Sequence, residues 1–270
     1  MKRNGWVWIL VVMAVFLMNL PILNALVTSF KTYAEIQSPH PRWLFRPVFS
    51  NYASIFHGQY PFPHYFLNSL IVAASAAILV VVVCFPAAYA IARYGTGKRT
   101  FFPVVVGIRL MPPIVFAVPY YLLLQAAGLI DTRIGLIAVE MTMNIPIALL
   151  LLVGFVQDLP KEVEEAALVD GCSTTELLLR VVLPMMSTGI TSVMILTFIF
   201  TWNDFLFPLI LTITKATTIT VGASLFITSF GIQWGPISAA IVLSIIPPLF
   251  FAFAAQRYLV KGLSMGAVKG

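Results

Sequence analysis

Long apolar segments separated by short polar ones organise this chain. Six such segments lie at residues 4–30, 66–92, 101–125, 134–157, 184 to about 211, and 235–257. Each is long enough for a helix that crosses a bilayer, which takes about 20 mainly apolar residues. The pattern therefore predicts an all-α polytopic membrane protein with six transmembrane helices. The first segment exceeds the apolar core of a cleaved signal peptide, so it is predicted to remain as an anchor.

The composition supports a membrane protein. Hydrophobic residues make up 60% of the chain and charged residues 10%, whereas soluble domains carry about 25% charged residues. The formal net charge of +6 does not gather on one polar face, as a nucleic-acid-binding surface would require. The basic residues lie instead at the ends of the apolar segments, so no nucleic-acid partner is predicted.

Basic residues also orient the chain, because cytoplasmic loops of membrane proteins carry an excess of Lys and Arg. With a cytoplasmic N-terminus, ten of them fall on the cytoplasmic side: Lys2, Arg3, Arg93, Lys98, Arg99, Lys161, Arg180, Arg257, Lys261 and Lys269. Five fall on the other side: Lys31, Arg42, Arg46, Arg133 and Lys215. Both termini and the loop at 158–184 are therefore predicted to be cytoplasmic.

Three regions are predicted along the chain. Residues 1–65 form an N-terminal transmembrane anchor and an exterior segment, residues 66–260 a core transmembrane domain, and residues 261–270 a cytoplasmic tail. The exterior segment has too few apolar residues for a core of its own. Its aromatic residues suit the membrane interface.

Cysteines and histidines do not indicate a catalytic or metal site. Cys84 and Cys172 lie in unlike surroundings, which argues against a disulfide. His40, His57 and His64 lack the spacing of metal ligands. Since no nucleophile–base grouping and no P-loop is visible either, the chain is not predicted to be an enzyme.

The loop at 158–184 is acidic, whereas the other cytoplasmic segments are basic. Pro160 suits the start of a helix, and the acidic residues after it suit the positive end of the helix dipole. The small side chains of Ala166 and Ala167 allow another backbone to approach the helix closely. Asp170-Gly171 is expected to end the helix.

A second short helix is expected to follow in the same loop. Ser173 or Thr174 can cap it, and Leu183-Pro184 is expected to break the chain and return it to the membrane. The sequence thus predicts a helix–turn–helix finger outside the bilayer. Such a finger either docks on a partner or serves as a solvated connector.

The same residues match a family motif. Its order is Glu-Ala-Ala, three residues, Gly, nine residues, a branched apolar residue, any residue, and Leu-Pro. Here it stands as Glu165-Ala166-Ala167, Gly171, Val181 and Leu183-Pro184. It resembles the EAA motif of permease subunits of binding-protein-dependent ABC importers. The stretches at 109–113, 202–205 and 262–270 are similar to the maltose-type carbohydrate-uptake group.

This resemblance implies a permease subunit in a bacterial or archaeal cytoplasmic (inner) membrane. Two partner ATPase subunits would hydrolyse ATP with Mg, a second permease subunit would complete the path, and an external or periplasmic solute-binding protein would deliver a sugar. A coupling helix would contact the ATPase through Glu164, Glu165, Ala166, Ala167, Asp170, Gly171, Leu183 and Pro184. The tail would contact it through Gly262, Gly266, Lys269 and Gly270. The resemblance implies no cofactor in this chain.

Charged residues inside apolar segments indicate functional sites, because they are costly in a bilayer. At 1.5 Å per residue, Arg109 lies about 12 Å and Glu140 about 25 Å from the cytoplasmic ends of their segments. This difference argues against a direct pair. Arg109 is expected to reach the cytoplasm or the carbonyls freed by Pro112 and Pro113.

Two polar clusters are candidates for the translocation path. Glu140 and Asn144 share a helix face, where they line a cavity or hydrogen-bond a neighbouring helix. Trp202, Asn203 and Asp204 lie towards the outer side, where an aromatic ring beside polar groups suits a sugar or the membrane interface. An ion-coupled secondary carrier that uses Arg109, Glu140 and Asp204 is the alternative function, although no inverted repeat supports it. The residues leave the identity of the sugar open.

Overall fold

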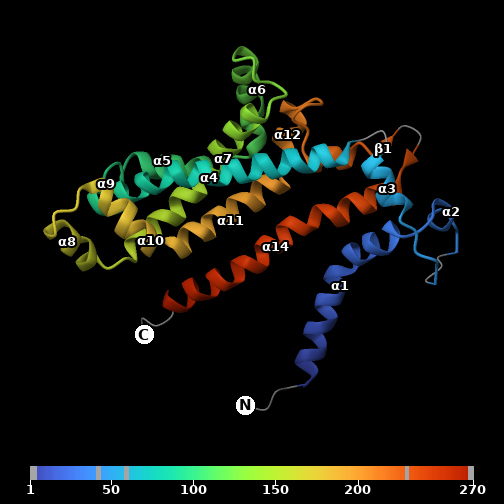
Figure 1. The fold of residues 1–270 in the computed structure, drawn as a ribbon, viewed down its shortest axis with the longest axis horizontal. Coiled ribbons are helices and arrows are strands. Elements are labelled where there is room, and N and C mark those ends of the chain that lie inside the picture. The colour runs from blue at the N-terminus through green and yellow to red at the C-terminus, as the bar shows by residue number, and fades with distance from the viewer. Residues whose placement is uncertain (1–4, 41–43, 58–60, 229–230, 267–270) are drawn as a thin grey trace. The chain divides into compact units, whose positions relative to one another are not determined.

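The computed structural model describes residues 5–40, 44–57, 61–228 and 231–266, with side chains as far as Ala254. The described chain is mostly helical, and Figure 1 labels its helices and strands and colours them from the N-terminus to the C-terminus. Contacts divide it into two units, residues 1–66 with 221–247 and residues 67–220 with 248–270. The two longest helices, α4 (Phe62–Tyr94) and α14 (Trp234–Gly266), contribute to both units.

The first unit is built around the N-terminal helix. Besides parts of α4 and α14 it contains α1 (Gly5–Ser29), α2 (Tyr33–Ile36), α3 (Ser50–His57), most of α13 (Ile219–Ser224), and the antiparallel pair β1 (Ile227–Thr228) and β2 (Gly231–Ile232). Asn51 of α3 donates hydrogen bonds to the carbonyls of Ser29 and Lys31, which fixes α3 at the end of α1. Residues 6–24 of α1 are all exposed. An apolar helix exposed all round suits a lipid environment.

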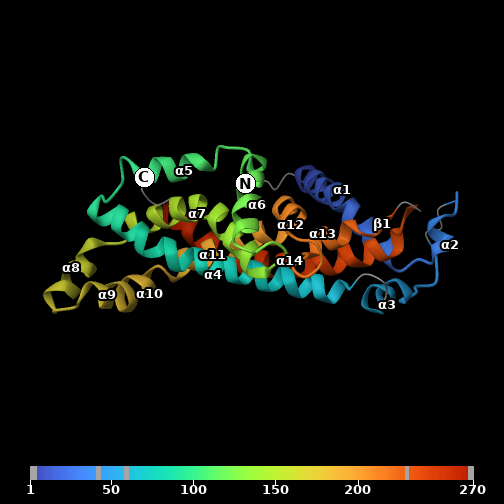
Figure 2. The ribbon, with the colours of Figure 1, turned by 90° about the horizontal axis from the view of Figure 1, so that it is seen from above.

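The second unit holds the remaining helices. They are α5 (Phe101–Ile108), the 3₁₀ turn η1 (Pro113–Phe116), α6 (Ala117–Ala126), α7 (Arg133–Gln157), α8 (Lys161–Val169), α9 (Thr174–Glu176), the π-helical η2 (Leu177–Val182), α10 (Leu183–Met185), α11 (Ser187–Asn203) and α12 (Leu206–Leu211). Figure 2 shows α5 running beside α7. Side chains of α4, α7, η2 and α11 bury the main core, and those with the lowest exposure include Val80, Ala88, Leu152, Val156 and Leu177.

Four described helices are long and apolar enough to cross a membrane: Trp6–Ser29, Phe62–Tyr94, Arg133–Gln157 and Trp234–Ala254. Two further pairs of helices pass the same test together but are bent, by 103° for Phe101–Ile108 with Pro113–Ala126 and by 77° for Thr174–Met185 with Ser187–Asn203. By length and composition, the described chain therefore has four candidate spans, or up to six if each bent pair is one span.

The segment at 101–125 is not one continuous helix as expected. Helix α5 ends at Ile108, and Pro112 has an extended backbone with ψ of 130°. A proline disfavours helical geometry in the residue before it, so Pro113 explains the break. Pro119, in contrast, lies in the first turn of α6, where its missing N–H interrupts no helical hydrogen bond. In Figure 1, α6 stands across the direction of α7.

The segment at 184–211 is also divided. Helix α11 ends at Asn203, and Asp204 is extended with ψ of 137°. The Asp204 carboxylate accepts a hydrogen bond from the N–H of Phe207 at 3.0 Å, which satisfies a free donor at the start of α12. A capping carboxylate thus explains why the helix stops and restarts here.

A hydrogen-bonded turn connects α6–α7 to the segment after α12. Asp131, with a positive φ of 56°, accepts hydrogen bonds from the backbone N–H groups of Ile213, Thr214, Lys215 and Ala216. Burial raises the pKa of this carboxyl, but the four backbone donors outweigh burial and lower it to about 2. This contact was not predictable from the sequence, because the partners of Asp131 lie more than 80 residues away.

We expect Asp131→Asn to lower the thermal stability of the protein at neutral pH. An amide offers one acceptor oxygen where the carboxylate offers two, and an unsatisfied donor costs about 1–3 kcal/mol when buried. Because the pKa of Asp131 is lowered on folding, its stabilising effect is present above about pH 4 and is lost as the pH falls towards 2. Melting curves at pH 7 and pH 3 should therefore differ more for the unmodified protein than for the variant. An equal pH dependence of the two would contradict this account.

Candidate functional site: an anchored loop and a polar pocket

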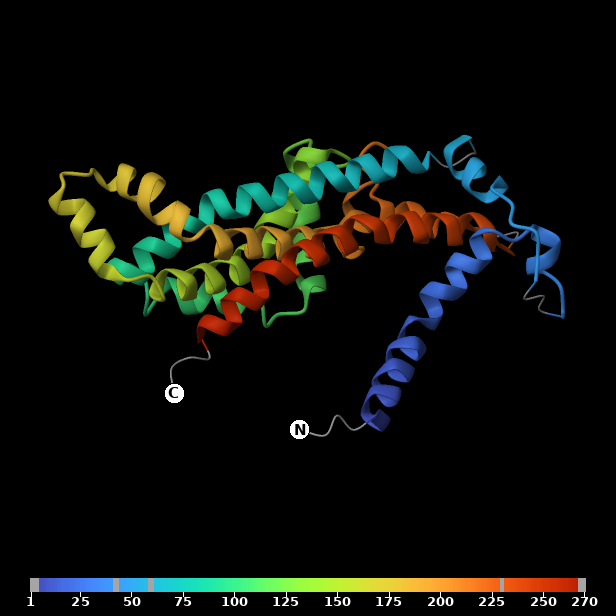
Figure 3. The same ribbon diagram turned by 60° about the horizontal axis from the view of Figure 1, so that its bottom comes forward.

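The loop at 158–184 folds as the finger that the sequence predicts. In Figure 3 it extends beyond the ends of α4 and α7. Helix α8 starts directly after Pro160, which occupies the N-cap, and Asp170 is its C-cap. Gly171 follows with a φ of +88° and an open surrounding, a conformation that a residue with a Cβ rarely adopts. Ser173 and Glu176 form a reciprocal capping box at α9, as expected from the capping residues.

The end of the finger differs from the expectation. Leu183 and Pro184 do not break the chain, because they lie in helix α10 directly after the π-helical turn η2. The direction changes only at Met186, between Met185 and Ser187. A π-helical turn changes the hydrogen-bonding pattern of the backbone, which is compatible with the missing N–H of Pro184. Leu183 packs against the core, whereas Pro184 is exposed.

Glu164 is the one buried acid of helix α8. Its carboxylate forms an ion pair with Arg93 of α4 at 2.5 Å, and the two side chains are only 6% and 8% exposed. Tyr89 of α4 donates a further hydrogen bond to Glu164 at 2.8 Å, and Arg93 donates one to the Leu159 carbonyl at 2.9 Å. Glu164 therefore binds within the chain, unlike its exposed neighbour Glu165. The sequence offered Arg93 only as an orienting charge and did not reveal this pair.

The outer surface of α8 combines acidic and apolar residues. Glu165, Ala166 and Asp170 are exposed, while Ala167 packs partly against the core. Three larger apolar side chains are exposed as well, namely Val163 at 42%, Leu168 at 48% and Val169 at 88%. Exposed apolar residues gathered on a polar loop are typical of a contact surface.

The tail residues are only partly described. Helix α14 continues to Gly266, so Gly262 and Gly266 lie in a helix. Lys269 and Gly270 lie outside the described residues.

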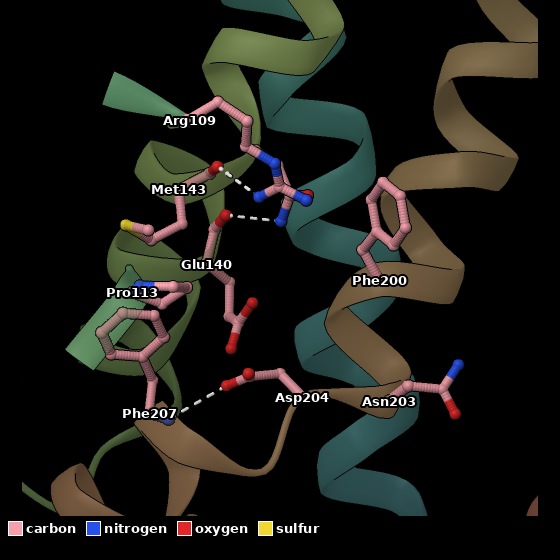
Figure 4. A pocket seen from close by; sticks show the side chains of 9 residues that line it. Arg109, Pro113, Glu140, Met143, Phe200, Asn203, Asp204 and Phe207 are labelled. Carbon is pink, nitrogen blue, oxygen red and sulfur yellow. Dashed lines mark hydrogen bonds between the residues drawn. The ribbon is translucent and has the colours of Figure 1, made fainter. Parts of the chain in front are cut away.

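All five residues predicted for the translocation path line one pocket. Arg109, Glu140, Asn144, Asn203 and Asp204 surround a cavity of about 230 Å³, together with Pro113, Met143, Phe200 and Phe207. The aromatic and apolar members of this lining were not predicted. Figure 4 shows the carboxylates of Glu140 and Asp204 pointing towards each other, with Arg109 at the opposite end of the pocket.

Arg109 and Glu140 share the pocket without forming an ion pair, as expected. The expected depth difference does not keep them apart, however, because the long side chain of Arg109 reaches α7 at Met143. Arg109 donates a hydrogen bond to the Met143 carbonyl of α7 at 3.5 Å, and its guanidinium lies 5.2 Å from the centre of the Phe200 ring. It therefore contacts a carbonyl of another helix, not those near Pro112 and Pro113.

Asn144 combines the two roles that the sequence left open. Its side-chain nitrogen donates to the Glu140 carbonyl at 2.8 Å and to the Thr201 hydroxyl of α11 at 3.2 Å, so it connects two helices while lining the pocket. Asn203, in contrast, donates to the Ile199 carbonyl of its own helix and points away from the carboxylates (Figure 4). Trp202 is 2% exposed and stacks on Phe198, so it presents almost no surface to a sugar or to lipid.

Neither cysteine forms a disulfide, since both Cys84 and Cys172 are free. Within the described residues, no group of three or more His, Cys, Asp or Glu side chains is arranged to hold a metal ion.

Residues 84–265 match the family model described as the inner membrane component of binding-protein-dependent transport systems. The chain belongs to this family. Members of this kind are permease components of ABC transporters and are not themselves enzymes, so the EAA sequence at 165–167 stands in its usual context. The family also places this permease in the inner membrane.

Relatives match the permease over nearly its whole length. It is 33% identical to the diacetylchitobiose uptake system permease protein DasC of Streptomyces coelicolor, covering 100% of both chains. It is 31% identical to the sulfoquinovosyl glycerol transport system permease protein SmoH of Agrobacterium fabrum, over 93% of this chain and 88% of the relative. It is 36% identical to the trehalose transport system permease protein SugB of Mycobacterium tuberculosis, over 83% and 82%.

A solved structure has the same fold. It is a bacterial ABC transporter involved in the import of the acidic polysaccharide alginate, with a TM-score of 0.77 and 20% identity, over 96% of this chain and 98% of that one. At this identity the similarity concerns the fold alone.

Proposed function

We propose that this permease imports a sugar or sugar derivative together with a second permease subunit. The observation that carries this proposal is the similarity to permeases named for diacetylchitobiose, trehalose and sulfoquinovosyl glycerol uptake, over at least four fifths of each chain. These named compounds are all carbohydrates or carbohydrate derivatives. An external or periplasmic solute-binding protein delivers the substrate, in keeping with the family description.

ATP hydrolysis in two partner ATPases drives transport through the loop at 158–184. The exposed surface of α8, with Glu165, Ala166 and Val169, suits a groove on an ATPase that accepts a short helix. The capped ends of α8 and α9 give the finger a defined shape, and the buried pair of Arg93 and Glu164 joins it to α4. A displacement of the loop is therefore passed to a membrane helix and is not absorbed by a flexible connector.

The orientation follows from the same arrangement. If α8 meets a cytoplasmic ATPase, both termini are cytoplasmic and six spans cross the membrane, with each bent pair as one span. The end of α14 then lies on the ATPase side, where Gly262 and Gly266 allow close approach of another backbone.

The pocket lined by Arg109, Glu140 and Asp204 is this subunit's part of the translocation path. Ligand sites combine apolar walls with a few converging polar groups, and this cavity has both. The alternative of an ion-coupled carrier uses the same three charges, but membership of an ABC permease family favours the ATP-driven mechanism.

The test is an ATPase assay on the assembled transporter in proteoliposomes, with its solute-binding protein and a panel of sugars. Stimulation of ATP hydrolysis and ATP-dependent uptake by one class of sugar is the expected result. The matched control is the permease alone in liposomes under an ion gradient. Sugar uptake by the permease alone would contradict the proposal and favour the carrier.

A further inference from the structure

The pocket contains two buried hydrogen-bond acceptors that no group in the described part of the chain satisfies. They are Oε1 of Glu140 and Oδ1 of Asn144, and each residue is 3% exposed. A buried polar group without a partner costs about 1–3 kcal/mol, so such groups are rare in folded proteins and call for an explanation. Both residues belong to the lining of the same cavity.

The orientation of the Asn144 amide is fixed by its neighbours. Its nitrogen donates to the Glu140 carbonyl and to the Thr201 hydroxyl, and a carbonyl oxygen can only accept. A flipped amide would therefore place two acceptors against each other. The oxygen of Asn144 is thus the atom that is left for the pocket.

The carboxylate of Asp204 adds further acceptor capacity. One of its oxygens accepts from the Phe207 N–H, and the group points towards Glu140 (Figure 4). Opposite them, the exposed Arg109 guanidinium is engaged with the Met143 carbonyl and the Phe200 ring. The part of the pocket around Glu140, Asn144 and Asp204 therefore presents several hydrogen-bond acceptors, including the carboxyl groups of two acids.

We propose that the acceptor group formed by Glu140, Asn144 and Asp204 binds hydrogen-bond donors of the ligand. These donors are the hydroxyl groups of a neutral sugar or the ammonium group of an amino sugar. Anionic sugars are expected to bind this group more weakly. This proposal rests on the proposed function and names its substrate class. A carboxylate or phosphate on the ligand brings only acceptors and a like charge, which leaves Oε1 of Glu140 unsatisfied and adds repulsion. A hydroxyl or ammonium group satisfies the same atoms.

The test uses three disaccharides with one skeleton and different charge. Cellobiose is neutral, chitobiose carries ammonium groups, and cellobiuronic acid carries a carboxylate in place of one hydroxymethyl group. Their binding to the assembled permease–ATPase complex, without the solute-binding protein, is measured by saturation-transfer NMR. We expect cellobiuronic acid to bind about tenfold more weakly than the other two, a difference of about 1.4 kcal/mol.

Variants assign the effect to the pocket. In the double variant Glu140→Gln/Asp204→Asn, the ratio of the dissociation constants of cellobiuronic acid and cellobiose should fall towards one. Chitobiose should bind no more tightly than cellobiose. The control is Thr142→Val, on the same helix but outside the pocket lining. It should leave the relative affinities for the three disaccharides unchanged. Equal binding of cellobiuronic acid and cellobiose to the unmodified complex would overturn the proposal, as would an unchanged ratio in the double variant.

The result also separates this proposal from the proposed function. If none of the three sugars binds to a complex that still shows sugar-stimulated ATP hydrolysis with its solute-binding protein, the pocket is not the ligand site, and the proposal is overturned while the import function stands. If that stimulation is absent with every sugar of the panel, the import function itself fails.

Discussion

Glu164→Gln is expected to weaken the attachment of the loop to α4 and to reduce coupled transport strongly. The change keeps the size of the side chain but removes the charge that pairs with Arg93 in a nearly buried position. Removing one partner of a buried ion pair costs about 3–5 kcal/mol, because the other charge is left uncompensated. Arg93→Met is expected to act in the same direction, since it leaves the Glu164 carboxylate buried with only the Tyr89 hydroxyl.

The matched control is Glu165→Gln, one residue further along the same helix. Glu165 is exposed, so its charge contributes little to stability. The measurements are the thermal stability of the purified permease complex, the rate of proteolysis in the loop, and ATP-dependent sugar uptake. Equal stability and proteolysis of the Glu164 and Glu165 variants would show that the pair does not hold the loop.

A smaller effect is expected for Tyr89→Phe. This change removes only the hydroxyl that donates to Glu164 at 2.8 Å and leaves the ion pair with Arg93 in place. A typical hydrogen bond contributes about 1 kcal/mol, and one to a charged group somewhat more. The loss of thermal stability should therefore be largest for Glu164→Gln, smaller for Tyr89→Phe and smallest for Glu165→Gln. This order distinguishes an anchor based on charge from general packing.

The two ends of α8 and the start of α9 were predictable because their signals are local. Pro160 precedes α8, Gly171 follows it, and Ser173 and Glu176 cap each other three residues apart. Each of these features depends on neighbours in the sequence, so one chain is enough to recognise it. The same holds for the apolar segments that became α1, α4, α7 and α14.

The contacts inside the fold were not predictable, because they join distant residues. Arg93 and Glu164 are 71 residues apart, and a single sequence does not reveal which of several glutamates is the buried partner of Arg93. Arg109 and Glu140 were placed at different depths on the assumption of straight helices. The long side chain of Arg109 nevertheless reaches the Met143 carbonyl of α7, so both residues line one pocket.

Ala166→Leu is expected to uncouple ATP hydrolysis from sugar uptake without unfolding the permease. Ala166 is exposed on α8, and leucine is nearly as good a helix former as alanine, so the helix should persist. A larger side chain at this position would keep the partner ATPase from approaching the backbone closely. We therefore expect ATP-dependent uptake to fall at least tenfold, a change of about 1.4 kcal/mol or more in the coupling contact.

Ala166→Ser is the matched control, because serine is small and leaves the surface low. Assembly of the complex is checked by co-purification of the ATPase, and coupling by sugar-stimulated ATP hydrolysis in proteoliposomes. Loss of uptake in the leucine variant with an assembled complex and a normal melting temperature supports a direct contact at Ala166. Normal uptake by Ala166→Leu would exclude a close contact there, and the ATPase would then have to engage another face of the loop, such as that around Val169.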